Sequence, residues 1–208
     1  MSRQGIFVAT SAVAITALIG ATFWMTVRGG EEDLFADCRT GAVAGGAEIG
    51  GPFTLTSETG ENVTDADVID RPTLVYFGYT FCPDVCPMDN ARNAEAQALL
   101  QERGYDVRTV FISVDPDRDT PEVLAEFTDY MHEDMIGLTG TPEQVKAAAQ
   151  AYRAYFKKQD GDPEYYLVDH TTFTYLMFPE IGFAEFFRRD MEADAMADAV
   201  ACFVDAAS

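Results

Sequence analysis

Basic side chains are scarce in this chain of 208 residues. Lysine and arginine together number 14, against 35 aspartate and glutamate residues, and the formal net charge at pH 7 is −21. A surface this acidic repels the phosphates of nucleic acids and anionic lipid headgroups, so we expect no nucleic-acid partner. It would attract cations or a basic protein face, although solubility alone also accounts for such a charge.

Histidine is scarcer still, because His132 and His170 are the only two in the chain. Any metal site that uses imidazole must therefore draw on one of these two. Internal repeats and low-complexity blocks are absent as well. About 178 residues follow the first 30, which is enough for one domain with its own core.

One long uncharged run stands near the start of the chain. Residues 5–27 (GIFVATSAVAITALIGATFWMTV) lie between Arg3 and Arg28. About 20 apolar residues cross a bilayer as a helix, and Trp24 suits the membrane–water interface. We predict one transmembrane helix in the inner membrane, with a short cytoplasmic start and the soluble domain in the periplasm. A cleaved signal peptide is the alternative, but its apolar core is usually shorter and no small-x-small site follows this run.

Glycines then predict a flexible tether before the domain. We divide the chain into a membrane anchor (1–30), a tether (31–47) and a globular domain (48–208).

Strand and helix patterns alternate through the domain. We expect a β-hairpin at 52–64 and three further strands at 73–79, 107–115 and 135–140. Helices are expected at 87–104, at a segment that begins at residue 120, at 141–158, and at 191–207. Strands 165–169 and 173–178 are expected to pair as a second hairpin. Such alternation predicts an α/β sheet with parallel strands and helices on its faces. The order favours a thioredoxin-like fold with an N-terminal β-hairpin.

Two cysteines stand directly behind the first predicted buried strand, in GYTFCPDVCPMD (78–89). Pro87 suits the first position of a helix, so Cys82 and Cys86 should form a turn that leads into it. Helix amino ends favour thiolates. At four-residue helical spacing the Cβ atoms lie about 5–6 Å apart, which suits a shared metal better than a relaxed disulfide.

A third ligand is needed, and His170 is the better candidate. It lies at a predicted turn between two strands, whereas His132 lies among charged residues at the end of a predicted helix. Two thiolates with one imidazole suit copper, and Cu(I) tolerates such low coordination, whereas structural zinc requires four ligands. Three carboxylates lie near the motifs: Asp84, Asp89 and Asp169. One of them could supply an oxygen ligand for Cu(II) or orient His170. The alternative is that they are helix-capping or solvated groups.

Three stretches together resemble the Sco/SenC copper chaperones of respiratory oxidases: YFGYTFCPDVCP (76–87), SVDPDRDTPEVLAEF (113–127) and VDHTTFTYLM (168–177). The resemblance implies a thioredoxin-like domain that binds one copper ion through Cys82, Cys86 and His170. It implies delivery of copper to, or reduction of the cysteines of, the binuclear copper centre in the copper-bearing subunit of cytochrome c oxidase. Other copper chaperones or thiol reductants are further expected partners. For Asp115–Thr120 we expect a structural or docking role.

Two features depart from this family pattern. The stretch MFPEIGFAEFFRRDM (177–191) replaces an expected acidic-glycine turn and carries aromatics that look exposed. Cys38 and Cys202 lie outside the shared motifs, and in an oxidising compartment they suggest a disulfide, with two buried free thiols as the alternative.

Other functions remain open at this point. A thiol–disulfide oxidoreductase would cycle Cys82 and Cys86 between dithiol and disulfide without using His170. A redox sensor would use the same pair to report to a membrane partner. A peroxidase relative would have no need for the second cysteine.

Overall fold

The computed structural model describes residue 20 and residues 34–39, 49–162 and 165–208. The chain separates into two units, Met1–Asp37 and Cys38–Ser208. The predicted membrane anchor lies outside the described residues apart from Gly20, and so does most of the predicted tether. No helix of the described ranges combines the length and the apolar character that crossing a bilayer requires.

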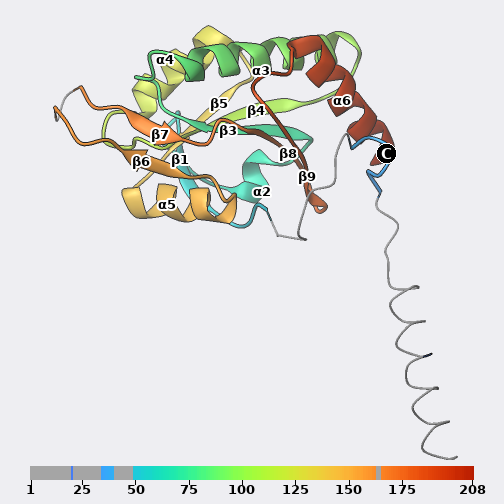
Figure 1. Ribbon diagram of the computed structural model, residues 1–208, viewed down its shortest axis with the longest axis horizontal. Helices are drawn as coiled ribbons and strands as arrows, with labels where there is room; N and C mark the ends of the chain where they lie inside the picture. The colour runs from blue at the N-terminus through green and yellow to red at the C-terminus, as the bar shows by residue number, and fades with distance from the viewer. Residues whose placement is uncertain (1–19, 21–33, 40–48, 163–164) are drawn as a thin grey trace, which may run out of the picture. The chain divides into compact units, whose positions relative to one another are not determined.

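Within the described part of the second unit, a mixed sheet of seven strands forms the centre (Figure 1). Its strands are β1 (Thr54–Ser57), β2 (Asn62–Thr64), β3 (Thr73–Gly78), β4 (Arg108–Ser113), β5 (Ile136–Thr139), β8 (Thr174–Phe178) and β9 (Gly182–Phe187). Their spatial order is β2-β1-β5-β4-β3-β8-β9. The central strands β3, β4 and β5 are parallel, and the hairpins β1–β2 and β8–β9 extend the sheet antiparallel on either side. The predicted α/β architecture and its first hairpin are thus confirmed.

The middle of the sheet is covered on both faces. Every residue of β3 is buried, as expected for a continuous apolar strand at the centre of a parallel sheet. Tyr76 of β3 stands beside Phe111 of β4 in the parallel register. Since both strands run the same way, the loops that follow them emerge at the same edge of the sheet.

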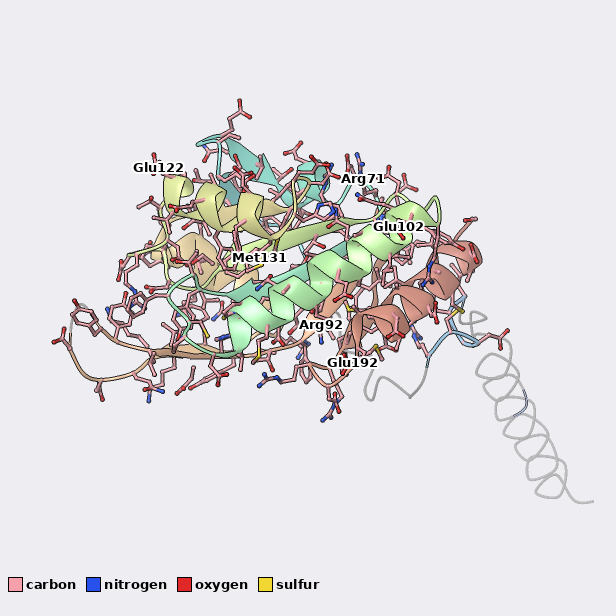
Figure 2. The ribbon with its side chains drawn as sticks, turned by 90° about the horizontal axis from the view of Figure 1, so that it is seen from above. Arg71, Arg92, Glu102, Glu122, Met131 and Glu192 are labelled. Atoms are coloured by element: carbon pink, nitrogen blue, oxygen red, sulfur yellow. A yellow bond between two sulfur atoms is a disulfide. The ribbon has the colours of Figure 1, made fainter. Side chains whose placement is uncertain are left out.

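Helices cover both faces of this sheet. They are α2 (Asp65–Val68), α3 (Val85–Glu102), α4 (Pro121–Met131), α5 (Pro142–Ala151) and α6 (Ala193–Ala206). In Figure 1, α3, α4 and α6 lie on one face of the sheet, whereas α2 and α5 lie on the other. Seen from above, α3 with Arg92 and Glu102 runs beside α6, which begins after Glu192 (Figure 2). Thr120 and Thr141 cap α4 and α5 as their Thr-Pro sequences predict.

Helix α3 begins two residues earlier than predicted. Asp84 is its N-cap, so Cys86 already lies in its first turn and Pro87 occupies the third helical position. The prediction that the helix starts at Pro87 was therefore wrong. A proline is tolerated at the third position because the first four N–H groups of a helix have no intrahelical acceptor.

The segment after α5 also differs from the prediction. The helix ends at Ala151 instead of continuing to residue 158, and Arg153 adopts a positive φ of 53°. The chain then forms β6 (Phe156–Lys158), which pairs with β7 (Val168–His170) in a separate two-stranded sheet. The predicted pairing of 165–169 with 173–178 was wrong, because β8 pairs with β3 and β9.

The stretch 177–191 forms the end of β8, the turn, and β9. Phe178 and Phe187 are buried, and Phe183 and Phe186 are half-buried. The expectation of exposed aromatics there was therefore wrong for these four side chains. β9 pairs with β8, and its rings pack against neighbouring rings, Phe183 against Tyr175 and Phe186 against Phe173. Ile181, at the turn, is exposed.

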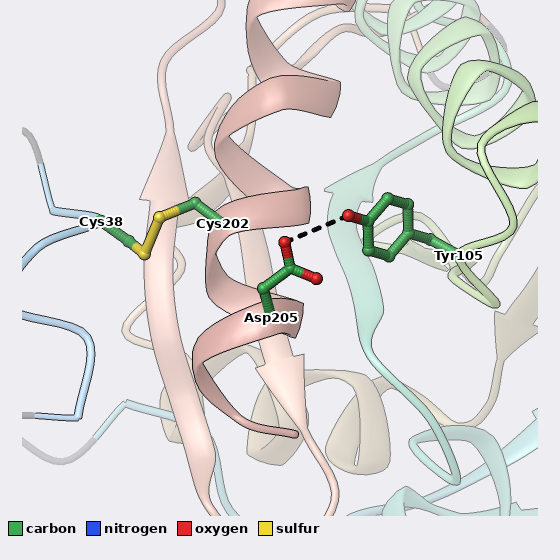
Figure 3. The surroundings of a disulfide bond; sticks show 4 residues. All are labelled: Cys38, Tyr105, Cys202 and Asp205. Atoms are coloured by element: carbon green, nitrogen blue, oxygen red, sulfur yellow. Dashed lines mark hydrogen bonds between the residues drawn. A yellow bond between two sulfur atoms is a disulfide. The ribbon is translucent and has the colours of Figure 1, made fainter.

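A disulfide joins Cys38 to Cys202 on α6, 164 residues apart in the sequence (Figure 3). The side chain of Arg39, next to Cys38, donates hydrogen bonds to the carbonyl oxygen of Ala184 in β9. These two contacts fix the start of the second unit to its last helix and to its edge strand.

Candidate metal centre

The two motif cysteines lie at the corner between β3 and α3. The N–H of Cys82 donates to the carbonyl oxygen of Tyr79 at 3.3 Å, which closes the turn after the strand. The N–H of Cys86, in the first turn of α3, points at the sulfur of Cys82 at 3.5 Å. Both cysteines are buried free thiols. The corner thus directs two sulfurs into one small volume.

The third predicted ligand reaches this corner from a different sheet. His170 is the last residue of β7 and pairs with Phe156 of β6. Its Nδ1 atom lies 2.9 Å from the carbonyl oxygen of Thr171. Because a carbonyl only accepts, Nδ1 carries a proton, and Nε2 is the ring nitrogen that faces the sulfurs and is available to bind a metal.

The three ligand atoms converge closely. Nε2 of His170 lies 3.2 Å from Sγ of Cys86. The sulfurs of Cys82 and Cys86 and a ring nitrogen of His170 all lie within 4.8 Å of one another, and no other group of this kind occurs in the described ranges. Two sulfurs and one imidazole nitrogen form a donor set that suits a soft ion of low coordination number.

The two thiols are electrostatically unequal. The pKa of Cys82 is lowered to about 3, first because the Cys86 thiol donates a hydrogen bond to it, with further help from His170 and from the N–H groups of Asp84 and Cys86. The pKa of Cys86 is raised, because the neighbouring Cys82 sulfur and burial both disfavour a second thiolate. Without metal, the pair therefore holds one thiolate and one thiol.

A buried hydrogen bond joins β3 to α3 next to the site. The hydroxyl of Tyr76, on β3, donates to Asp89 on α3 at 2.9 Å, and both side chains are buried. The Tyr76 ring also meets the His170 ring edge-on, with centroids 6.1 Å apart. Burial raises the pKa of Asp89, and the hydrogen bond from Tyr76 opposes that shift. The guanidinium of Arg189 lies 3.9 Å from the same carboxylate.

Gly78 leaves room for the second sulfur. A Cβ at this position would stand 3.0 Å from Sγ of Cys86, 2.8 Å from the Tyr76 ring and 2.9 Å from the Phe111 ring. Real Cβ atoms essentially never approach a neighbour as closely as this one would approach the two rings, and the contact with the sulfur would also be tight. A residue without a side chain is therefore required where β3 passes beneath the metal centre.

The other residues considered from the sequence lie elsewhere. Asp84 is exposed at the N-cap of α3, and Asp169 is exposed and accepts from Gln159. Neither they nor Asp89 joins the ligand group. The carbonyl of Thr171, not a carboxylate, orients His170. His132 ends α4 and accepts from the N–H of Asp134 at 3.1 Å.

Sequence reasoning missed the roles of Tyr76 and Gly78. Both belong to the apolar stretch that predicts β3, and nothing in that stretch distinguishes them from ordinary core residues. Only the packing of α3 against β3 places them beside the cysteines.

Comparison with known proteins agrees with this geometry. The SCO1/SenC family model matches residues 41–205. The chain belongs to the SCO1/SenC family. The resemblance noted in the sequence motifs is thereby confirmed.

Individual SCO1/SenC proteins are similar over most of the chain. Protein SenC of Rhodobacter capsulatus is 56% identical over 206 residues, which cover 99% of this chain and 92% of that protein. Protein SCO1 homolog 1 of Arabidopsis thaliana, a mitochondrial protein, is 42% identical over 78% of this chain and 49% of its own length.

Solved structures extend the likeness to the fold. The crystal structure of Arabidopsis thaliana ScoI with copper bound superposes with a TM-score of 0.73 at 41% identity, covering 76% of this chain and 98% of that one. Yeast Sco1 with copper bound gives a TM-score of 0.72 at 34% identity, covering 76% and 90% of the two chains. The thioredoxin-like α/β fold predicted from the order of elements is that of these SCO1/SenC structures.

Proposed function

We propose that this chain is a copper-binding assembly factor for cytochrome c oxidase. It would deliver copper to the binuclear copper centre in the copper-bearing subunit of the oxidase, or reduce the cysteines of that centre. Copper, held by Cys82, Cys86 and His170, is the cargo. The proposal is supported by membership of the SCO1/SenC family and by relatives whose structures hold copper.

The main support for this proposal is the geometry of the three ligand atoms. Two sulfurs and an imidazole nitrogen from distant parts of the sequence lie within 4.8 Å of one another. Thiolates and imidazole suit Cu(I), and three ligands leave room for an incoming one. Transfer would then proceed by ligand exchange, with acceptor thiols replacing Cys82 and Cys86 in turn.

The cellular location that we propose for the protein is based on residues 5–27. We propose that this run anchors the protein in the inner membrane by a single pass, with the metal-binding domain in the periplasm. An anchored domain would stay close to an oxidase in the same membrane. Selective labelling of a cysteine-free variant that carries one new surface cysteine in the domain tests the topology in intact cells.

Metal binding is tested by titrating Cu(I) into the reduced protein in competition with a chromophoric chelator. We expect one equivalent to bind, and we expect binding to weaken strongly in Cys82→Ala, Cys86→Ala and His170→Ala. His132→Ala is the matched control, because its ring lies outside the ligand group. Unchanged affinity in His170→Ala would remove the third ligand from the proposal.

The cellular role is tested in a deletion strain assayed for copper in its oxidase. A loss of oxidase copper that recovers when copper is added to the medium supports delivery. An oxidase with normal copper and activity would contradict a role in its assembly.

A thiol–disulfide oxidoreductase is the second candidate, and the unequal thiols favour it. A lowered pKa at Cys82 and a buried Cys86 match an attacking thiolate and a resolving thiol. The reaction would transfer two electrons from the dithiol to a target disulfide and leave a Cys82–Cys86 disulfide. Reductase turnover that persists in metal-free His170→Ala would favour this function, because the two sulfurs alone carry the electrons and the imidazole only assists the Cys82 thiolate.

A further inference from the structure

The ligands of the metal centre come from two elements that share no strand pairing. Cys82 and Cys86 lie at the corner after β3, in the large sheet, whereas His170 belongs to the separate β6–β7 sheet. Residues 171–173 link His170 to β8, which pairs with β3. The distance between the sulfurs and the imidazole therefore depends on this short link and on the side chains that join the two elements. The loop 114–120, which follows β4, contacts both.

One end of this loop holds the cysteine corner. Asp119 is fully buried and accepts three hydrogen bonds: from the N–H of Thr80 at 3.0 Å, from its hydroxyl at 2.6 Å, and from the hydroxyl of Ser113 at 2.6 Å. Thr80 stands two residues before Cys82. The position of the corner relative to β4 is thus fixed by a carboxylate whose contacts are all internal.

The other end of the loop holds the histidine hairpin. Tyr166, which precedes β7, donates its hydroxyl to the buried carboxylate of Asp115 at 2.6 Å. Lys158 of β6 lies over the same ring at 3.5 Å. A more direct contact also exists, because the Tyr79 ring meets the His170 ring edge-on, with centroids 5.7 Å apart.

Arg118 lies where these two halves meet. Its guanidinium stands 3.7 Å from the centre of the Tyr166 ring and 4.5 Å from that of Phe81, the residue before Cys82. Its Nε atom donates to Asp115. The two outer nitrogens are buried and have no hydrogen-bond partner among the described residues. Aromatic faces therefore hold this cation, and they come from both sides of the metal centre.

We propose that Arg118 is a positioning residue of the metal centre. By packing against Phe81 and Tyr166 at once, it sets the distance between the thiol pair and His170. The inference rests on the proposed function, because Cys82, Cys86 and His170 matter together only as ligands of one ion. Lysine cannot replace this arginine, since it lacks both the planar group and the Nε donor.

The test is the substitution Arg118→Lys in the full chain. In Cu(I)-loaded wild type, X-ray absorption should find two sulfur ligands and one nitrogen ligand. In the variant we expect the two sulfurs to remain, because Asp119 still holds their corner, while the nitrogen is lost and Cu(I) affinity falls about 10- to 100-fold. Arg103→Lys is the matched control, because Arg103 pairs with Asp198 at the surface, and it should change neither quantity.

A second readout needs no copper. Hydrogen exchange in the metal-free variant should become at least about tenfold faster in β6 and β7 while α3 keeps its protection. Equal acceleration in both would indicate general loss of stability and would overturn the proposal, as would an unchanged nitrogen ligand. If Arg118→Lys does not fold, Phe81→Leu is tested instead, because Phe81 is exposed and its substitution should leave the fold intact. That variant should weaken Cu(I) binding a few-fold, and unchanged binding overturns the proposal.

The two proposals fail differently. If X-ray absorption finds no nitrogen ligand in the Cu(I)-loaded wild-type protein, the three-ligand site of the proposed function is contradicted. The hydrogen-exchange comparison would still show whether Arg118 joins the hairpin to the cysteine corner.

Discussion

Nε2 of His170 lies 3.2 Å from Sγ of Cys86, although 84 residues separate the two in the chain. The contact joins the end of a short strand in one sheet to the first turn of a helix that follows another. Its geometry depends on a glycine beneath the sulfur, a buried tyrosine beside the imidazole, and two unequal thiols. Each of these features can be changed separately.

Gly78→Ala should damage both the fold and the metal site. The added Cβ would stand 3.0 Å or less from Cys86, Tyr76 and Phe111, none of which can move freely at the centre of the sheet. Overpacking of this kind costs about 1–3 kcal/mol, which urea unfolding measures. Gly161→Ala is the control, because a Cβ there meets nothing within 4 Å, and it should change stability by less than about 0.5 kcal/mol. Equal stability of the two variants would contradict the prediction.

Tyr76→Phe should lower the free energy of unfolding by about 1–3 kcal/mol, because Asp89 would lose its hydrogen-bond donor while remaining buried. Tyr105→Phe is the matched control. Its hydroxyl donates to Asp205 at 3.2 Å in an exposed position. Figure 3 draws this hydrogen bond, and its loss should cost less than about 0.5 kcal/mol. Denaturant unfolding of both variants makes the comparison, and a harmless Tyr76→Phe would show that Asp89 does not need this donor.

Cys82 should remain a thiolate in the reduced, metal-free protein across pH 5–8. Its pKa is lowered to about 3, so protonation occurs only well below this range. An ordinary thiol, with a pKa of about 8.5, would lose about tenfold of its thiolate for each pH unit below that value. We expect the alkylation rate of Cys82, followed by peptide mass spectrometry, to be nearly constant over this range. A tenfold fall per unit would mean that the neighbouring thiol and N–H groups do not stabilise the anion.

Removal of the disulfide should destabilise the domain without changing its metal affinity. The bond between Cys38 and Cys202 closes a loop with a sequence separation of 164 residues, and neither residue belongs to the ligand group. In the loop-entropy model such a closure is worth about 5 kcal/mol. Unfolding and Cu(I) titration of the Cys38→Ser/Cys202→Ser double variant measure both quantities. A loss of stability below about 1 kcal/mol would show that the cross-link constrains the unfolded chain little.

Much of the framework could be predicted because its signals are local. The buried run at 73–79 and the Thr-Pro pairs before α4 and α5 each specify their element within a few residues. Local rules were weaker at boundaries. They placed the start of α3 at Pro87, although a proline is equally acceptable two positions inside a helix.

The sequence by itself determined the parallel core, the corner that carries Cys82 and Cys86, and the choice of His170 over His132, because spacing, capping and residue chemistry are properties of short segments. Only the tertiary structure decided that residues 156–158, predicted as part of a helix, form a strand that pairs with the strand of His170. It also decided that Arg118 packs between Phe81 and Tyr166. Strand pairing and side-chain stacking join segments far apart in the chain, and their free energy depends on what the whole fold brings together.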